Sequence, residues 1–308
     1  MRRYRGVALG ASVLVLLISA CTTGGSSQSP AASQATKPKI IVGSADFYES
    51  TLVAEMYAQA LEAKGYTVER KLVLGARKLT NDALKNGQLN LMPEYIGSDA
   101  REFKAEATGD PEATAANLKK ALEPLGLTLL DVAPGQDQNG FVVRQETATK
   151  YNLKTLTDLA AVTDKLKWGL PPECKTSPSC HQALLDSYEI DTDKLEVVPL
   201  APCSAPMAEA LNSGNVDVAE LCTTQPAIQQ FNFVLLDDDK RSQPADNMAP
   251  VVRKDLLDSA PADFAETLNA ISAKLTTDEL TALGVEIINN HKTEAEVAKK
   301  WLTDNGLI

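Results

Sequence analysis

From residue 39 onward, short apolar runs alternate with segments in which apolar side chains recur every three or four residues. The runs have the length of strands, and the periodic segments have the spacing of helices. Gly65 and Gly87 each follow a periodic segment, as glycines that cap helix C-termini do. The predicted order is a strand at 39–43, a helix at 50–64, a strand at 66–74, a helix at 77–86 and a strand at 89–92. This alternation predicts an α/β fold.

A similar order of elements recurs about 126 residues later in the chain. Residues 83–91, ALKNGQLNL, match residues 210–218, ALNSGNVDV, in every residue class. Upstream of each match, the strand that ends at Gly43 corresponds to residues 167–169. The pattern predicts two lobes of matching α/β architecture, and chance similarity between two amphipathic units is the alternative.

Two polar, turn-rich segments, at 134–140 and 235–247, separate the predicted lobes. Farther along, Thr276 and Thr293 each precede a glutamate by the spacing of a helix capping box. We predict a first lobe of residues 39–140 plus 248–308 and a second lobe of residues 141–247. Two crossovers between the lobes form a hinge, with a ligand cleft where the carboxyl ends of the strands face each other.

Residues 1–21 have the order of a secretory signal. Three arginines precede an apolar stretch at 7–18 that is too short to span a bilayer, and the small residues before Cys21 resemble a lipobox. We predict a signal peptide at 1–20, lipidation of Cys21 and a flexible tether at 21–38. The folded body is then extracytoplasmic and held at the cell membrane by a lipid anchor. A plain signal peptide is the alternative.

Charge and hydropathy exclude two classes of protein. The 30 Lys and Arg residues against 41 Asp and Glu residues give a net charge of −11, and no basic stripe interrupts the acidic body. Such a charge repels phosphate backbones, so we expect no nucleic-acid partner. The chain has one apolar run suited to a membrane, at its N-terminus, which excludes a polytopic transporter.

Four cysteines lie in the predicted second lobe, and an even number in an exported protein favours two disulfides. Four cysteines allow three pairings. A polar turn separates Cys174 from Cys180, which favours that pair together with Cys203–Cys222. His181 is adjacent, but the spacing lacks the second ligand cluster that a zinc site needs, so we predict no metal.

Catalytic motifs are missing from the sequence. It contains no G-x-S-x-G elbow, Walker loop, strand-linked G-x-G-x-x-G or H-E-x-x-H. The two histidines, His181 and His291, do not lie at predicted strand ends, and the acidic run 237–239 is typical of a solvated turn. We therefore predict neither a catalytic residue nor a cofactor, and the chain is not expected to be an enzyme.

Four motifs, in order, resemble substrate-binding proteins of ABC-type importers for glycine betaine, choline, carnitine and related compatible solutes. They are GSADFYE at 43–49, PEYIGS at 93–98, LDDDK at 236–240 and APVVR at 249–253. The resemblance implies a two-lobed, type II periplasmic-binding-protein-like fold. It also implies a monomer that delivers a small solute to an ABC permease, with a role in osmoprotection.

The resemblance also implies the ligand contacts. A quaternary ammonium has no N–H donors, so aromatic faces hold it. Tyr95 is the best candidate for such a cage, with Phe47 beside it, and Phe141 takes a place where the family often has tyrosine. Asn139 supplies a polar contact at the crossover. Ser44 and Asp46 line the end of the first strand. Ordinary core packing is the alternative for both phenylalanines.

The second lobe departs from the family pattern. Cys222-Thr223-Thr224-Gln225 stands where the family commonly has Tyr-Ser-Thr-Asp, and residues 243–247 lack an expected Pro-Tyr pair. The side chains of this region instead predict neutral hydrogen-bonding groups, which suit a polyol, a sugar-like solute or a phenolic compound: Thr223, Thr224, Gln225 and Asn247. Two other functions stay open: an extracytoplasmic lipoprotein hydrolase, and a surface lipoprotein that acts through protein contacts alone.

Overall fold

The computed structural model describes residues 37–308. The predicted signal peptide, the lipidation site Cys21 and all but the last two residues of the predicted tether lie outside this part of the chain. Within residues 37–308, no helix combines the length and the apolar character that crossing a membrane requires.

The first of two sheets has the strand order β2-β1-β3-β10-β4. β1 runs parallel to β2 and β3, whereas β10 is antiparallel to both of its neighbours. The strands are β1 (Ile40–Gly43), β2 (Val68–Lys71), β3 (Leu91–Tyr95), β4 (Leu127–Leu129) and β10 (Met248–Arg253). β3 is buried along its whole length, as a strand covered on both faces must be.

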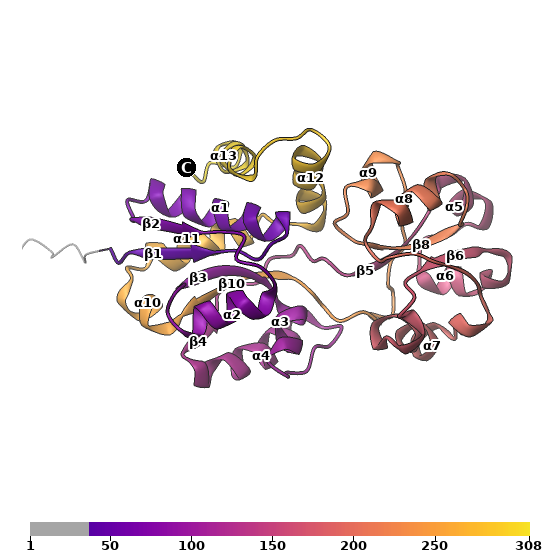
Figure 1. Cartoon of the computed structure of the whole chain (residues 1–308), viewed down its shortest axis with the longest axis horizontal. Coiled ribbons are helices and arrows are strands. Elements are labelled where there is room, and N and C mark those ends of the chain that lie inside the picture. Colours follow the sequence, from indigo (N-terminus) through magenta and orange to yellow (C-terminus); the bar gives the residue numbers. More distant parts are fainter. Residues whose placement is uncertain (1–36) are drawn as a thin grey trace, which may run out of the picture. The chain divides into compact units, whose positions relative to one another are not determined.

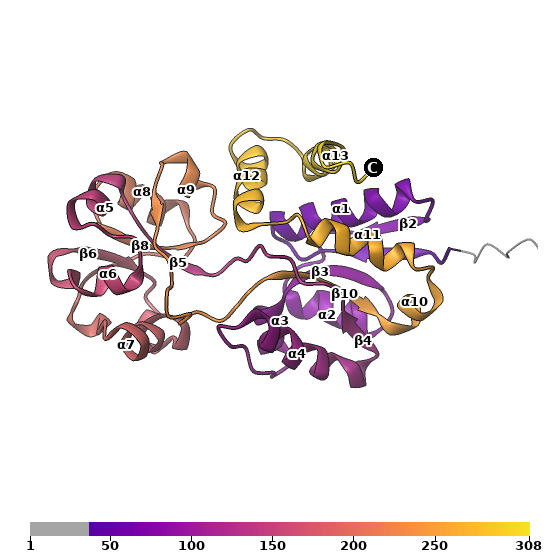
Figure 2. The same cartoon turned by 180° about the vertical axis from the view of Figure 1, so that it is seen from behind.

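Helices cover the two faces of this sheet (Figures 1 and 2). They are α1 (Tyr48–Ala63), α2 (Arg77–Lys85), α3 (Ile96–Glu102), α4 (Pro111–Leu122), α10 (Lys254–Ser259), α11 (Asp263–Ser272), α12 (Thr277–Ile288) and α13 (Glu294–Asp304). One apolar cluster joins α1 to α11, α12 and α13, and another joins α2, α3 and α4. The C-terminal helices therefore complete the core of the first sheet.

The predicted caps of the last two helices are present. Thr276 accepts a hydrogen bond from the backbone N–H of Glu279, and Thr293 forms a reciprocal capping box with Glu296. These bonds satisfy N–H groups that have no partner within the helix. The capping signals thus located the starts of both helices correctly.

The second sheet has the order β7-β6-β8-β5-β9. Its strands are β5 (Asn139–Val143), β6 (Lys167–Leu170), β7 (Glu196–Pro199), β8 (Val218–Cys222) and β9 (Val234–Leu235). Its helices are α5 (Gln145–Tyr151), α6 (Leu156–Ala160), α7 (Ala183–Tyr188), α8 (Ala205–Asn212) and α9 (Ala227–Gln230). β6 runs parallel to β7 and β8, whereas β5 is antiparallel to β8 and β9.

The two sheets share one topology. β6, β7, β8, β5 and β9 correspond in order and direction to β1, β2, β3, β10 and β4. Even a local contact repeats: Arg253 in β10 donates to two carbonyls at the end of α2, and Arg144 after β5 donates to carbonyls at and beyond the end of α8. This agreement matches the predicted duplication of architecture.

Two extended segments cross between the sheets, from β4 to β5 and from β9 to β10 (Figure 1). β5 already begins at Asn139, slightly before the start at 141 that the sequence predicts for the second lobe. The lobe boundaries of 39–140 plus 248–308 and 141–247 remain our proposal for how the chain divides.

Candidate functional site

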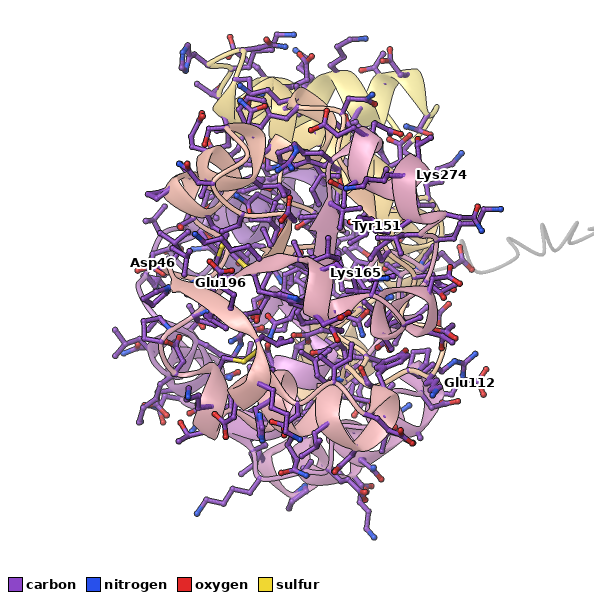
Figure 3. The ribbon with its side chains drawn as sticks, turned by 90° about the vertical axis from the view of Figure 1, so that its right-hand side faces the viewer. Asp46, Glu112, Tyr151, Lys165, Glu196 and Lys274 are labelled. Atoms are coloured by element: carbon purple, nitrogen blue, oxygen red, sulfur yellow. A yellow bond between two sulfur atoms is a disulfide. The ribbon has the colours of Figure 1, made fainter. Side chains whose placement is uncertain are left out.

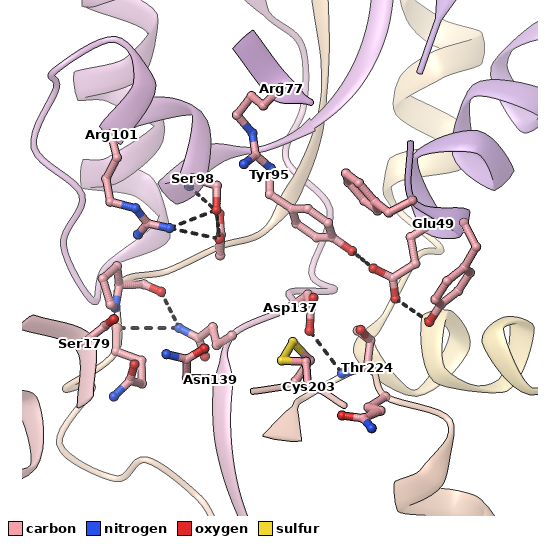
Figure 4. Close-up of a pocket in the computed structure, with 18 of the residues that line it drawn as sticks. Glu49, Arg77, Tyr95, Ser98, Arg101, Asp137, Asn139, Ser179, Cys203 and Thr224 are labelled. Carbon is pink, nitrogen blue, oxygen red and sulfur yellow. Dashed lines mark hydrogen bonds and ion pairs between the residues drawn. A yellow bond between two sulfur atoms is a disulfide. The ribbon is translucent and has the colours of Figure 1, made fainter. Parts of the chain in front are cut away.

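A pocket of about 490 Å³ lies where the ends of several strands meet the crossovers (Figure 4). The first sheet contributes the segment that leads from β1 into α1, the start of α2 and the segment from the end of β3 into α3. The second sheet contributes the end of β8 and the segment before α8. Its lining residues are Phe47, Tyr48, Glu49, Arg77, Tyr95, Ser98, Arg101, Asp137, Gln138, Asn139, Ser179, Cys203, Cys222, Thr224, Gln225, Pro226, Gln243, Pro244 and Asp246.

One end of the pocket combines aromatic rings with a buried carboxylate. Glu49 is only 3% exposed, and it accepts hydrogen bonds from the hydroxyls of Tyr48 at 3.0 Å and Tyr95 at 2.5 Å. Phe47 stacks on the Tyr95 ring, with a centroid distance of 6.2 Å and an interplanar angle of 20°. Burial raises the pKa of Glu49, while hydrogen bonds from Thr224 and both tyrosines act in the opposite direction.

A second carboxylate, Asp137, belongs to the first crossover. Its Oδ1 accepts a hydrogen bond from the backbone N–H of Thr224 at 3.3 Å. Burial, and then the nearby charge of Glu49, raise the pKa of Asp137 to about 7. Both acidic groups therefore resist ionisation, and a cation that enters the pocket would stabilise their ionised forms.

Guanidinium groups lie in another part of the lining. Arg101 donates from Nη2 to the Ser98 hydroxyl at 2.9 Å, and that hydroxyl donates to Oδ2 of Asp246 at 2.6 Å. Ser98 and Arg101 lie on the opposite side of the pocket from Glu49 (Figure 4). The pocket therefore has two chemically different ends.

Arg77 is held by a buried partner. Its Nε donates to Oε2 of Glu94 at 2.9 Å, and Glu94 is almost completely buried. Within residues 37–308, the Nη1 and Nη2 groups of Arg77 make no hydrogen bond, so these donors remain for a ligand. Beneath this pair, burial and then the charge of Glu94 raise the pKa of Asp99 to about 8, so Asp99 is mostly neutral at pH 7.

Four of the residues predicted to bind ligand line this pocket: Phe47, Tyr95, Asn139 and Thr224. Ser44 and Asp46 do not. Ser44 is fully buried, and its Oγ accepts the N–H of Val73 at 2.9 Å, which fixes the loop after β2. Asp46 is exposed at the surface (Figure 3).

Phe141, Thr223 and Asn247 also lie outside this pocket, and line a neighbouring cavity of about 640 Å³ beside the crossovers. Phe141 packs edge-on against Trp168 in the core of the second sheet. For this residue, core packing, the alternative to ligand binding, therefore holds. The Thr223 hydroxyl accepts the N–H of Gln138 at 2.9 Å, and the Asn247 amide donates to crossover carbonyls. These polar side chains hold the crossovers.

Five charged residues of the pocket are not among the predicted site residues: Glu49, Arg77, Arg101, Asp137 and Asp246. Glu49 ends the GSADFYE motif and was therefore within reach. Asp137 stands in a segment that composition marks only as turn-rich, and nothing in the pattern distinguishes the two arginines from solvated helix residues. The neutral lining expected from the second lobe covers only part of the pocket.

Both disulfides in the structure follow the pairing that the sequence favours. Cys174 is bonded to Cys180 with Cα atoms 5.1 Å apart, and Cys203 to Cys222 with Cα atoms 5.0 Å apart. The first bridge is buried in the core of the second sheet, whereas both half-cystines of the other bridge line the pocket.

The potential metal ligands that cluster in residues 37–308 have other partners. Cys174 and Cys180 lie near Glu220 but are bonded to each other. His181 lies near Asp191 and Asp193, whose carboxylates pair with lysines. Neither cluster borders the pocket.

Comparisons with known proteins agree on one family. Residues 38–304 match the family model described as the substrate binding domain of ABC-type glycine betaine transport system. A carnitine transport binding protein of Listeria monocytogenes is 27% identical over 94% of each chain. The glycine betaine-binding protein YehZ of Escherichia coli is 27% identical over 89% of this chain and 92% of its own.

Solved structures agree with the sequence relatives. Apo YehZ from Escherichia coli is 26% identical, with a TM-score of 0.78 over 88% of this chain and 99% of its own. A glycine betaine/carnitine/choline ABC transporter structure has a TM-score of 0.80 over 87% of this chain and 99% of its own, at 24% identity. The fold is thus that of the type II periplasmic binding proteins.

Proposed function

Because the chain belongs to the family of substrate binding domains of ABC-type glycine betaine transport systems, we propose that its ligand is a small zwitterion with a quaternary ammonium at one end and a carboxylate at the other. Proteins of this family bind a solute and deliver it to the permease of an ABC importer; they are not enzymes. The hydrolase alternative finds no support in this family.

The observation that carries the proposal is the position of Glu49. Its buried carboxylate lies among Phe47, Tyr48 and Tyr95 and has Asp137 as a charged neighbour. An ammonium without N–H donors gains from aromatic faces and from negative charge in a desolvated site. A polyol, sugar-like or phenolic ligand would leave these buried carboxylates uncompensated. We therefore favour a cationic group over the neutral ligands that the second lobe alone indicates.

The other end of the pocket suits an anionic oxygen. The free Nη groups of Arg77 and the guanidinium of Arg101 are donors of the kind that carboxylates accept. The names of the relatives fit such a ligand, since carnitine and glycine betaine both carry a quaternary ammonium and a carboxylate. Choline lacks the carboxylate, so we expect it to bind more weakly.

The cellular placement is part of the same proposal. We infer that the mature protein is a monomer anchored outside the membrane through lipidated Cys21, beside the permease that accepts its ligand. The signal-like order of residues 1–21 supports an exported chain, and an anchored binding protein stays within reach of its permease.

Calorimetry on purified protein tests the ligand class. Glycine betaine and carnitine are compared with choline, sorbitol and a phenolic acid, and thermal shift detects binding to the folded state. We expect Glu49→Gln to weaken zwitterion binding, while Asp46→Asn, a charge loss outside the lining, leaves it unchanged. Binding of a neutral compound with no binding of either zwitterion would contradict the proposal.

A further inference from the structure

Each lobe contains a bond that ties two of its own segments together, and the two bonds lie at corresponding places in the two lobes. Tyr95 at the end of β3 is paired with the first residue of β10, and Cys222 at the end of β8 is paired with the first residue of β5. These two strand ends therefore occupy equivalent positions in the two sheets. In both sheets, the end of this strand is tied to the start of the helix that precedes the strand in the chain.

The two ties differ in chemistry. In the first sheet, Arg77 at the start of α2 makes an ion pair with Glu94 of β3, with an N–O distance of 2.9 Å. In the second sheet, Cys203, which directly precedes the N-cap residue of α8, is bonded to Cys222 of β8. Arg77 and both half-cystines line the pocket. A covalent bond in the second lobe thus links the two segments that correspond to those joined by an ion pair in the first lobe.

The disulfide holds the second lobe's contribution to the pocket. Thr224, two positions after Cys222, is 2% exposed and donates its N–H to Asp137 of the first crossover. The side-chain amide of Gln225 donates to the carbonyl of Ser204 at 3.4 Å, next to Cys203. Cys203 itself has a φ of 50°, a left-handed conformation that a non-glycine residue keeps only when its surroundings hold it.

Two buried polar atoms near the Cys203–Cys222 bridge make no hydrogen bond within residues 37–308. They are the Oε1 of Gln225 and the Nε2 of Gln243, and both residues line the pocket. A buried donor or acceptor without a partner is costly, so a ligand that supplies the missing bond gains affinity. That gain requires the segment 223–225 to stay in place.

We propose that the Cys203–Cys222 disulfide is a positioning element of the ligand pocket, and that opening it lowers ligand affinity while the Cys174–Cys180 disulfide has no such role. The affinity part rests on the proposed function. The Cys203–Cys222 bridge lines the pocket, so a small dithiol can reach it. The dithiol transfers two electrons and two protons to the bridge: two cysteine thiols form, and the dithiol is oxidised to a cyclic disulfide. Cys174 and Cys180 are 2% and 1% exposed, so their bridge is shielded from the dithiol.

The test compares Cys203→Ser/Cys222→Ser with Cys174→Ser/Cys180→Ser, since both variants lose one bridge. Calorimetry with glycine betaine and carnitine is expected to show about a tenfold rise in Kd for the first variant and less than a threefold change for the second. Melting temperatures of both variants separate a pocket effect from a general loss of stability, because the control also loses a bridge.

Hydrogen exchange of the amides of residues 223–225 decides the positioning role without any ligand. These amides donate to Gln138, Asp137 and Cys222, and we expect faster exchange in the first variant alone. Unchanged exchange there, or unchanged Kd, would overturn the inference. If the wild type binds neither zwitterion, the proposed ligand class is wrong while the exchange still decides. If the variant does not fold, the folded wild type treated with dithiothreitol replaces it, with the reduced cysteines identified by mass spectrometry.

Discussion

Protonation of Asp137 is expected to weaken ligand binding as the pH falls from 8 to 6. Burial, and then the charge of Glu49, raise its pKa to about 7. A bound ammonium favours the ionised carboxylate, so binding lowers this pKa and releases a proton. The sign follows: affinity is highest above pH 7 and falls below it, while the carboxylate of the ligand stays ionised throughout this range.

The size of the effect follows from the ionised fraction. With a pKa of about 7, Asp137 is about nine-tenths ionised at pH 8 and about one-tenth ionised at pH 6. If only the ionised form binds the cation well, Kd rises about tenfold, or about 1.4 kcal/mol. Glu49 and Asp246 face the same group and also have raised pKa values, so Asp137→Asn is expected to reduce the pH dependence rather than abolish it.

Titration calorimetry at pH 6, 7 and 8 and constant ionic strength measures this directly. Repeating it in buffers of different ionisation enthalpy counts the protons released on binding. Asp46→Asn is the matched control, because Asp46 is an exposed carboxylate outside the lining. A Kd that stays constant from pH 6 to pH 8, or an equal slope in wild type and Asp137→Asn, would refute the reasoning.

Four further outcomes are expected. Tyr95→Ala should weaken ligand binding by about 1–3 kcal/mol while circular dichroism shows an intact fold, and an unchanged affinity would remove Tyr95 from the site. Glycine betaine should bind this wild type less tightly than a family member with a complete aromatic cage, as calorimetry under equal conditions would measure. Cys21→Ala should release the protein from the membrane fraction on immunoblots, and full retention would contradict lipidation. Peptide mapping without reduction should recover Cys174 linked to Cys180, a small loop that stabilises by about 2 kcal/mol, and free thiols at both positions would contradict the pairing.

The periodic parts of the fold could be predicted from the sequence because they depend on local pattern. The helix from Ser50 and the caps at Thr276 and Thr293 follow from apolar spacing and from hydrogen bonds within one turn. The start of α1 at Tyr48 could not be predicted in this way, because the side chain of its N-cap residue makes no capping hydrogen bond. The extent of β2, which is an edge strand, depends on its pairing with β1, and no local sequence pattern encodes that pairing.

The site could be predicted only in part. Phe47 and Tyr95 could be predicted from the family resemblance of the motifs at 43–49 and 93–98, and both line the pocket. Phe141 does not reach the pocket because its ring lies farther along β5 than Asn139 and packs against Trp168 in the core of the second sheet. Arg77 and Asp137 join the pocket through tertiary contacts over long sequence distances, which one sequence does not reveal.

The two lobes of the duplicated architecture carry different residues at equivalent positions beside the pocket. The strand end that carries Tyr95 in the first sheet carries Cys222 in the second. As a result, the aromatic rings and the guanidinium groups of the pocket all belong to the first lobe, while the second lobe adds a disulfide and neutral groups such as Thr224. A ligand with two charged ends can then be oriented by the first lobe alone. We propose that the second lobe closes over such a ligand with hydrogen bonds and excludes water, which would strengthen the electrostatic contacts made by the first lobe.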